Sequence, residues 1–192
     1  DGIRDSVASR GRGDVYKRQA IFGQGPVGLS ATMFAAQLGA RVIAVDISSY
    51  RLNLAKELGA SEIIDSSSHN AEQIIRELTS GEGAECTLDA TGIPEVRIQA
   101  VDSAKYWGKV CFVGEGNTTT FDVSAQIIHK QLTILGSWTF SQAGLSEVAN
   151  FVIQRQSPMD KLITHTFPLK EAQKAYDTFI SGETGKVILT MN

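Results

Sequence analysis

Residues 21–28 read IFGQGPVG, and this stretch carries the strongest structural signal in the chain. It is a G-x-G-x-x-G pattern that follows an apolar run and opens a helical pattern, the context in which it predicts a dinucleotide-binding turn. Gly23 permits a tight turn, Gly25 lets a pyrophosphate approach the backbone, and Gly28 lets the helix lie close to the strand. The stretch therefore predicts a strand, a turn and a helix, in that order.

The start of the predicted helix is a phosphate-binding position. Pro26 suits the first helical turn, because its missing N–H would have no partner there. The unpaired N–H groups and the positive end of the helix dipole around Val27 would face the phosphates. A glycine turn without a ligand is the alternative interpretation. The residue that ends the next strand distinguishes between these two interpretations.

Asp46 ends that next strand, RVIAVD at 41–46, and lies 18 residues after Gly28. This is close to the spacing of about 20 expected for the acid that binds the adenosine ribose. A 2′-phosphate at the same place would repel the carboxylate by roughly 4 kcal/mol at about 4 Å. NAD is therefore favoured over NADP. The alternative for Asp46 is to cap a helix that begins near Ser48, a role compatible with ribose binding.

The predicted cofactor site continues beyond the acid. Ile47 follows Asp46 directly, and Arg51, one turn into the next helix, is placed to stack on the adenine, with a solvated surface arginine as the alternative. In an open parallel sheet the ligand lies outside the carboxyl ends of the strands, and small residues follow three further predicted strands there. These residues are Ala90, Thr91, Gly92, Val113, Gly114 and Ser137. Each loop alone is common, but together they favour a flat dinucleotide lying along the backbone.

From Ala20 onward, short apolar runs alternate with helical patterns, which predicts an α/β fold of the Rossmann type with a doubly wound parallel sheet. Strands are expected at 20–22, 41–46, 62–64, 86–89, 109–113 and 132–135, with helices over 27–38 and 71–78 among those between them. The pattern changes after Gly136, where a helix, an extended piece, a second helix and a final strand at 186–190 follow. We therefore predict an NAD-binding domain over 20–137 and a separate C-terminal segment over 138–192.

Residues 1–19 have neither a helical nor a strand period. Their last six residues, DVYKRQ, resemble a translated adapter sequence, so we expect 1–19 to be a non-native or disordered leader. A natural flexible arm is the alternative.

Composition excludes several classes of partner. The 192 residues are 42% hydrophobic and carry a net charge of -3, so no basic surface is predicted to bind nucleic acid. No apolar run reaches the roughly 20 residues that a membrane-spanning helix needs. Cys86 and Cys111 lie in apolar stretches and are predicted to be small buried residues, which fits a reducing cytoplasm.

From Ala20 to its end the chain resembles the C-terminal half of the medium-chain, zinc-type alcohol dehydrogenases. The segments that carry the resemblance are GQGPVGL at 23–29, VD at 45–46, RL at 51–52, LGA at 58–60, DATG at 89–92, GKV at 108–110, LITH at 162–165 and GKVIL at 185–189. The resemblance implies NAD as the cofactor. It also implies that residues 138–192 return to a catalytic domain that is absent from this chain.

The resemblance implies roles for single residues as well. Arg51 would meet the adenine edge, Thr91 would line the path of the cofactor, and the main chain near Val113 and Ser137 would hold the nicotinamide carboxamide. Lys186 would reach back to the pyrophosphate from the final strand, with a surface lysine as the alternative.

The zinc ligands are where the chain departs from the family. Members bind a catalytic zinc through Cys, His and acidic residues placed before the nucleotide domain, and those positions are not in this chain. We expect His69 and His129 to be surface or cap residues and His165 to be packed, because they lie in unrelated segments without metal-ligand spacing. We therefore predict no catalytic or metal-binding residue here, zinc only in the intact parent, and no activity for this chain alone.

The predicted function is the nucleotide-binding part of an NAD-dependent, zinc-dependent alcohol or polyol dehydrogenase, which moves a hydride between an alcohol or ketone and nicotinamide. The alternatives are a zinc-free quinone-reductase type, which usually prefers NADPH, and a non-redox Rossmann module that binds a nucleotide or a methyl donor. The last predicted strand, 132–135, has an apolar edge, so we expect a homo-oligomer through it.

Overall fold

The computed structural model describes residues 17–139 and 141–191, so most of the predicted leader lies outside the described residues. The first part of the chain forms β1 (Arg18–Phe22), α2 (Pro26–Gln37), β2 (Arg41–Asp46), α3 (Ser49–Glu57), β3 (Glu62–Asp65), α4 (Ala71–Leu78), β4 (Ala84–Asp89), α5 (Pro94–Ser103), β5 (Ala104–Phe112), η2 (Val123–Ile128) and β6 (Thr133–Gly136). The second part forms α6 (Gln142–Arg155), η3 (Met159–Leu162), β7 (Ile163–Pro168), η4 (Leu169–Glu171), α7 (Ala172–Ile180) and β8 (Lys186–Thr190).

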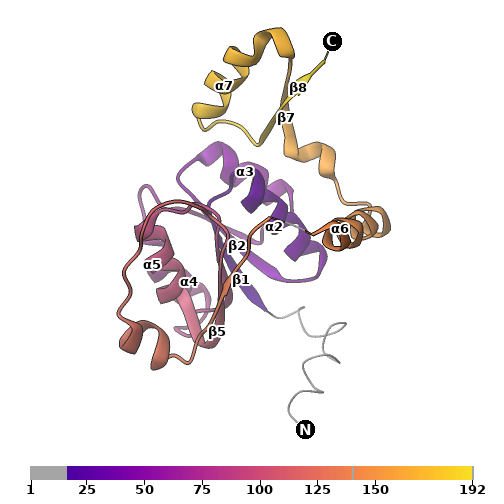
Figure 1. The fold of residues 1–192 in the computed structure, drawn as a ribbon. Helices are drawn as coiled ribbons and strands as arrows, with labels where there is room; N and C mark the ends of the chain where they lie inside the picture. Colours follow the sequence, from indigo (N-terminus) through magenta and orange to yellow (C-terminus); the bar gives the residue numbers. More distant parts are fainter. Residues whose placement is uncertain (1–16, 140, 192) are drawn as a thin grey trace.

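The first six strands make one sheet in the order β3-β2-β1-β4-β5-β6, and every neighbouring pair is parallel. This is the strand order of dinucleotide-binding domains, in which the chain winds outward in both directions from β1. The predicted Rossmann fold is confirmed. Helices α2 and α3 lie on one face of the sheet and α4 and α5 on the other (Figure 1).

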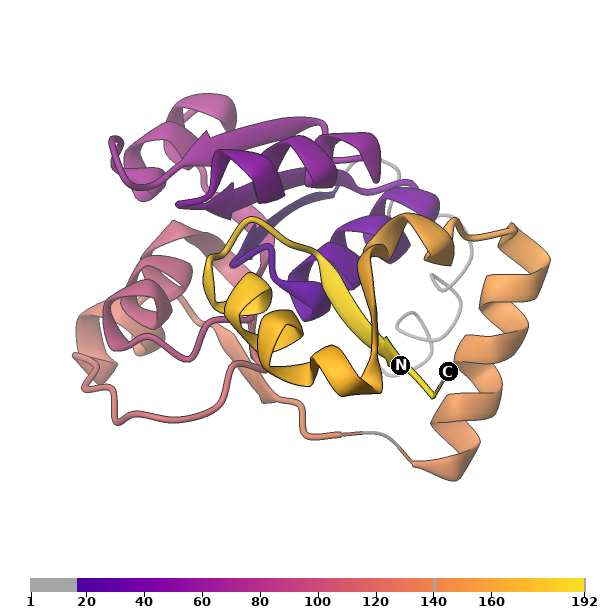
Figure 2. The same ribbon diagram turned by 90° about the horizontal axis from the view of Figure 1, so that it is seen from above.

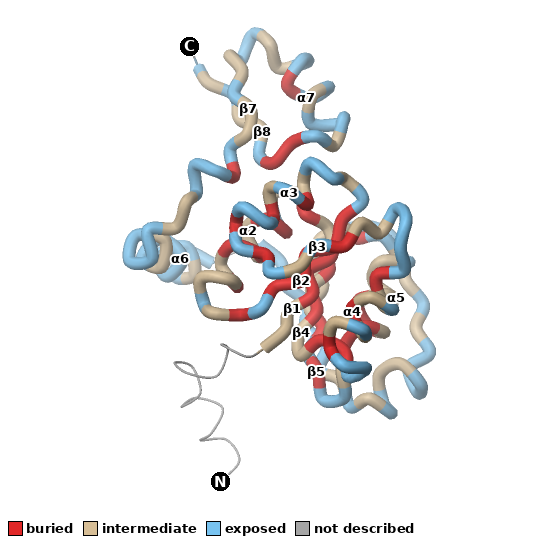
Figure 3. The backbone as a smooth tube through the Cα atoms, turned by 180° about the vertical axis from the view of Figure 1, so that it is seen from behind, coloured by how far each residue is buried: buried red, intermediate tan, exposed pale blue. Residues whose placement is uncertain are grey.

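Both faces of the strands near β1 and β2 are apolar, as parallel sheets require. Alternate residues of β1 and β2 pack on opposite sides: Ile21 and Ala44 belong to the cluster that contains α2 and α3 residues, and Phe22 and Ile43 to the cluster that contains α4 and α5 residues. Buried residues gather along the strands and on parts of these helices (Figure 3). The core therefore lies under the part of the predicted site that β1 and β2 carry, which is the glycine turn and Asp46.

Strand β1 begins two residues earlier than the predicted start at Ala20, because Arg18 and Gln19 pair with Arg41 and Val42 of β2. The Arg18 guanidinium also reaches Glu85, with its Nε 3.0 Å from one carboxylate oxygen and Nη2 2.7 Å from the other. Charged residues at a strand end carry no apolar period, so the sequence pattern could not show this. The boundary predicted at residue 19 therefore lies inside the strand.

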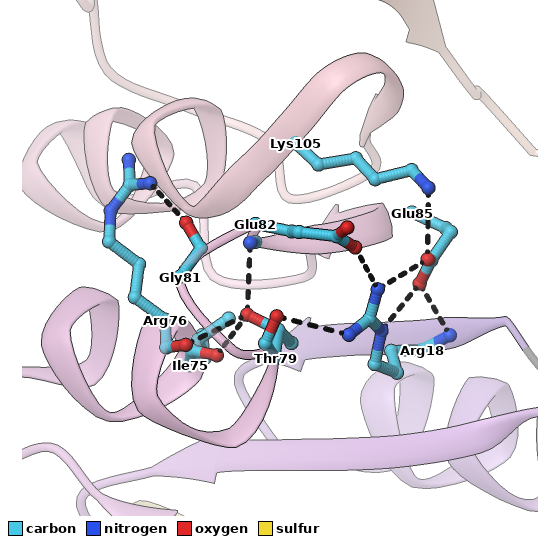
Figure 4. Close-up of polar contacts among 9 residues, drawn as sticks. Arg18, Ile75, Arg76, Thr79, Gly81, Glu82, Glu85 and Lys105 are labelled. Atoms are coloured by element: carbon cyan, nitrogen blue, oxygen red, sulfur yellow. Dashed lines mark hydrogen bonds and ion pairs between the residues drawn. The ribbon is translucent and has the colours of Figure 1, made fainter.

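Arg18 is the centre of a wider polar network at the amino ends of β1 and β4 (Figure 4). It also donates to Glu82, at 2.8 Å, and to the carbonyl of Thr79, at 3.2 Å, while Lys105 reaches Glu85 at 3.0 Å. Burial alone would raise the pKa of Glu85, but hydrogen bonds from Arg18 and Lys105 outweigh it and lower that pKa to about 2. The network thus holds an ionised Glu85 between two cations.

Strand β5 is longer than the predicted 109–113. It begins at Ala104, and its pairing with β4 is irregular, with a register shift between Ala84 and Cys86. Trp107, within this part, has a φ of 58°. The apolar pattern marks only the regular part of the strand, which explains the late predicted start.

After β6 the chain leaves the six-stranded sheet. Strands β7 and β8 pair in parallel as a separate two-stranded sheet that carries α7 (Figures 1 and 2). Helix α6 lies beside α2, where Phe34 and Phe151 meet edge to face with ring centroids 5.4 Å apart. Among the described residues, none of the helices has the length and apolar character needed to cross a membrane.

Candidate functional site

The glycine turn between β1 and α2 has the geometry that its sequence predicts. Gly23 has a φ of +85°, and a Cβ on it would lie 2.5 Å from the Thr91 side chain. A Cβ on Gly28 would lie 1.7 Å from the carbonyl oxygen of Gly23, so α2 packs directly against the turn. A Cβ on Gly25, by contrast, would meet nothing within 4 Å. The fold thus requires two of the three glycines, while the space in front of Gly25 is open.

Gln24, between the first two glycines, holds the turn from inside. Its side chain is fully buried, donates to the carbonyl of Ile21 at 2.9 Å and accepts from the Thr32 hydroxyl at 2.9 Å. The sequence pattern does not mark Gln24 as a residue of the site, because Gln24 stands at a variable position of the motif. The only signal was a polar residue where the chain leaves a buried strand.

Asp46 lies at the carboxyl end of β2, where it was predicted, and only 7% of it is exposed. One carboxylate oxygen accepts from the N–H of Gln24 and the other from the N–H of Ser48, the latter at 2.8 Å. These bonds place the acid against the glycine turn. The alternative role of Asp46 as a helix cap is wrong, because Ser48 caps α3 by accepting from the N–H of Arg51.

The structure places Arg51 and Ser48 at the contact with the C-terminal segment. Arg51 Nε donates to the carbonyl of Thr184 at 3.1 Å, and Ser48 Oγ donates to the carbonyl of Gly182 at 3.2 Å. Arg51 is therefore not simply a solvated surface arginine, since Thr184 holds its Nε, and its contact with the adenine stays a prediction. Ile47, between Asp46 and Ser48, is 71% exposed at the carboxyl edge of the sheet.

Lys186, at the start of β8, comes close to the first turn of α2. It lines a pocket of about 280 Å³ together with Pro26, and apolar residues of α7 and β8 complete the walls. Val27, next to Pro26, is 54% exposed. The structure thus brings the predicted pyrophosphate residues Pro26, Val27 and Lys186 to one region, although 160 residues separate the first from the last.

Asp89 organises the loop after β4. It is completely buried, and it accepts from the N–H of Thr91 at 2.9 Å, the hydroxyl of Thr91 at 2.6 Å and the N–H of Gly92 at 3.2 Å. The N–H of Ala90 donates to the carbonyl of Phe22 at 2.9 Å, which sets this loop beside the glycine turn. Ala90, Thr91 and Gly92 therefore share one edge with Gly23.

A groove of about 640 Å³ lies at the carboxyl ends of β5 and β6. Its walls include the predicted residues Val113, Gly114 and Ser137. Trp138 also lines this groove and is 70% exposed. The predicted site thus forms one continuous edge, with Asp46 and the glycine turn towards one end and the groove at the other.

A family model for zinc-binding dehydrogenases matches residues 26–154, which run from the start of α2 into the last turn of α6. The chain belongs to the zinc-binding dehydrogenase family. A zinc-type alcohol dehydrogenase-like protein of Escherichia coli (strain K12), YphC, is 38% identical over 174 residues, which are 88% of this chain and 48% of that protein. The chain spans about half the length of the curated relatives it matches.

Solved structures of alcohol dehydrogenases share the fold. Benzyl alcohol dehydrogenase from Acinetobacter calcoaceticus superposes with a TM-score of 0.84 at 33% identity, over 92% of this chain and 50% of that one. An alcohol dehydrogenase from Escherichia coli CFT073, complexed with NADH, superposes with a TM-score of 0.81 at 25% identity, over 98% and 56% of the two chains. Both cover this zinc-binding dehydrogenase chain almost completely and extend well beyond it.

Within the part of this zinc-binding dehydrogenase chain that the structure describes, no three His, Cys, Asp or Glu side chains are grouped so that they could hold a metal ion. His69 and His129 are exposed and His165 is half-buried, so all three are placed as the sequence analysis expected. Cys86 and Cys111 are half-buried rather than buried. Burial raises the pKa of the Cys111 thiol above its ordinary value.

Proposed function

We propose that this chain is the NAD-binding half of a zinc-dependent alcohol or polyol dehydrogenase. The observation that carries the proposal is the placement of Asp46 against a glycine turn whose middle glycine, Gly25, faces open space. A turn without a ligand would explain Gly23 and Gly28 by packing alone. It would not explain why a glycine stands at the open position 25 beside a nearly buried carboxylate that keeps free acceptor capacity.

The residues fit NAD for separate physical reasons. A carboxylate offers about four acceptor positions, and the amides of Gln24 and Ser48 take one on each oxygen of Asp46, so both oxygens keep capacity for the ribose hydroxyls. The first turn of α2 has unpaired N–H groups and a positive dipole end, which favour the pyrophosphate. NADP fits less well, since its 2′-phosphate would lie against the Asp46 carboxylate.

The groove at β5 and β6 would receive the nicotinamide. Main-chain groups near Val113 and Ser137 would hold its carboxamide and so orient the ring. In the complete protein, zinc bound by the other half would act as a Lewis acid on the oxygen of the alcohol or ketone substrate. The residues of this chain bind and orient the coenzyme, and on their own they would not turn over substrate.

Isothermal titration calorimetry of the chain with NADH, NADPH and S-adenosylmethionine tests the proposal. We expect binding of NADH, at least tenfold weaker binding of NADPH, and no binding of S-adenosylmethionine; the tenfold margin corresponds to about 1.4 kcal/mol. In the Asp46→Asn variant the affinity for NADH should fall. The ratio of the NADH affinity to the NADPH affinity should also fall, because the charge that repels the 2′-phosphate is gone. Tight NADPH binding without NADH binding would instead favour the quinone-reductase type, and S-adenosylmethionine binding a non-redox module.

We also propose that the parent is a homo-oligomer that pairs through β6. This strand is the edge of the six-stranded sheet, and Ile134 and Leu135 on it are 39% and 46% exposed. An exposed apolar edge strand offers unpaired backbone groups to a second copy.

A further inference from the structure

Arg97, on α5, joins two loops of the candidate site. Its side chain is only 14% exposed. Nη2 donates to the carbonyls of Gly114 and Gly116, at 2.8 and 2.7 Å. Nη1 donates to the carbonyl of Asn117 at 3.1 Å and to the hydroxyl of Thr119 at 3.3 Å. One guanidinium thus hydrogen-bonds to four acceptors in the loop that follows β5.

The other side of Arg97 faces the loop after β4. Its Nε forms an ion pair with Asp89, 3.5 Å from Oδ2 and without a hydrogen bond, while this buried carboxylate accepts hydrogen bonds from Thr91 and Gly92. The Asp89–Arg97 ion pair therefore couples the positions of the two loops.

The loops touch backbone to backbone, so they have little freedom to adjust. A Cβ on Gly92 would lie 2.1 Å from the carbonyl oxygen of Glu115, and one on Gly114 would lie 2.1 Å from the N–H nitrogen of Gly92. The Asn117 side chain closes the contact by donating to the carbonyl of Gly92 at 3.0 Å. A small shift of one loop is thus passed on to the other.

Arg97 also determines which way the peptides of the second loop point. In a planar trans peptide the C=O and the following N–H point in opposite directions. Because the carbonyls of Gly114, Gly116 and Asn117 face Arg97, the next N–H groups point away from it. Residues 114–118 line the groove of about 640 Å³ together with Arg97.

We propose that Arg97 is a positioning residue for the nicotinamide end of the coenzyme, an inference that rests on the proposed function. It holds the loops after β4 and β5 in the shape that receives that end. The adenosine end is held by a different set of bonds, those that join Asp46 to Gln24 and Ser48. Loss of Arg97 should therefore affect the two ends of the ligand unequally.

Lysine cannot replace arginine in this role. The planar guanidinium presents five donors in a fixed fork, and here it reaches four acceptors in one loop and a carboxylate in another. An ammonium keeps the charge but not the fork. Arg97→Lys thus separates the geometric effect from a general loss of positive charge.

The test compares ADP, which occupies only the adenosine end, with NADH, using calorimetry on the full chain. Wild type should bind NADH about tenfold more tightly than ADP. In Arg97→Met the NADH affinity should fall about tenfold, to that of ADP, while the ADP affinity changes less than about twofold. Arg97→Lys should show most of the same loss. If Arg97→Met does not fold, Arg97→Lys carries the comparison alone.

Arg76→Met is the matched control. Arg76, on α4, also bonds a carboxylate and a main-chain carbonyl, Glu72 and Asp102, each at 2.9 Å, but it is not among the residues that line the groove. We expect it to change neither affinity. Equal loss of ADP and NADH in Arg97→Met, or no loss of either, would overturn the inference. So would a wild type that binds ADP as tightly as NADH. A wild type that binds neither ligand would instead contradict the proposed function.

Discussion

The two halves of the main sheet differ in how well this chain covers them. One row of paired residues runs across the sheet on the side of α2 and α3: Ala44, Ile21, Leu88, Cys111 and Leu135. Exposure rises along it from 0% and 2% at the first two residues, through half-buried, to 46% at the last. Parallel sheets are normally covered on both faces. On this face of the sheet, the half around β1 and β2 is therefore covered by other parts of the chain, and the half towards β6 is left exposed.

The difference has a functional counterpart. Asp46 and the glycine turn belong to the covered half, where their positions follow from a packed core. Ser137 and Trp138 belong to the open half and are exposed. The chain alone thus defines the proposed adenosine end more firmly than the proposed nicotinamide end.

The largest expected effect is on the free energy of unfolding, and it should differ between a glycine in the covered half and a glycine in the open half. Gly28→Ala should destabilise the fold by more than about 3 kcal/mol, because its Cβ would enter the backbone at Gly23. Gly136→Ala, at the end of β6, should change stability by less than about 0.5 kcal/mol, since its Cβ would meet nothing within 4 Å. Urea unfolding measures both. Similar losses in the two variants would contradict the contrast.

Gly25→Ala should separate binding from stability within the covered half. Its Cβ would meet no protein atom within 4 Å, so the cost to unfolding is about 1 kcal/mol or less, the difference between Gly and Ala at a helix N-cap. The affinity for NADH should fall about tenfold or more, because the Cβ would occupy the space proposed for the pyrophosphate. Unchanged NADH affinity in calorimetry would argue against a ligand at this turn.

The Glu85 network at the junction of the halves predicts a pH dependence. The pKa of Glu85 is about 2 in the folded chain and 4.5 for an unperturbed glutamate, so its contribution is fully present above pH 4.5 and is lost as the pH falls towards 2. Glu85→Gln should cost about 2 kcal/mol at pH 7 and much less near pH 3. Urea unfolding of both proteins across this range provides the measurement. A difference that does not change with pH would show that Glu85 acts by packing alone.

The smallest effect on stability is expected at the open edge. Leu135→Lys should change unfolding by less than about 0.5 kcal/mol but reduce self-association, because it places a charge on the exposed β6 edge. Light scattering reports the size of the assembly. Ile63→Lys, on the opposite edge strand β3 and 37% exposed, is the matched control and should leave the assembly unchanged.

The sequence predicted the covered half better than the open one, for a physical reason. Gly23, Gly28 and Asp46 form a local pattern whose spacing follows directly from a strand, a turn and a helix. The ion pair of Asp89 and Arg97 has no such pattern, since an arginine within a helix usually lies in solvent. Only the strand order, which sets the loops after β4 and β5 side by side, shows that this arginine is enclosed.

Arg18 and Arg51 illustrate the same limit. By its sequence Arg18 lies in the expected leader and Arg51 is predicted to meet the adenine, and the sequence does not show the specific bonds that both make to distant segments, at Glu85 and at Thr184. Periodicity describes what a residue does within its own element. It contains no information on which distant carbonyl or carboxylate a long side chain will reach.

The buried side-chain amide of Gln24 limits which residues can stand at the second position of the glycine motif, although that position is usually written as any residue. Its nitrogen donates to Ile21 and its oxygen accepts from Thr32, so a substitute must offer both a donor and an acceptor of the same reach. Glutamate would bring a charge into a buried position, and leucine would leave a carbonyl and a hydroxyl unsatisfied. In this chain the interior therefore restricts the second residue of the motif, Gln24, as strictly as the proposed coenzyme would restrict the third, Gly25.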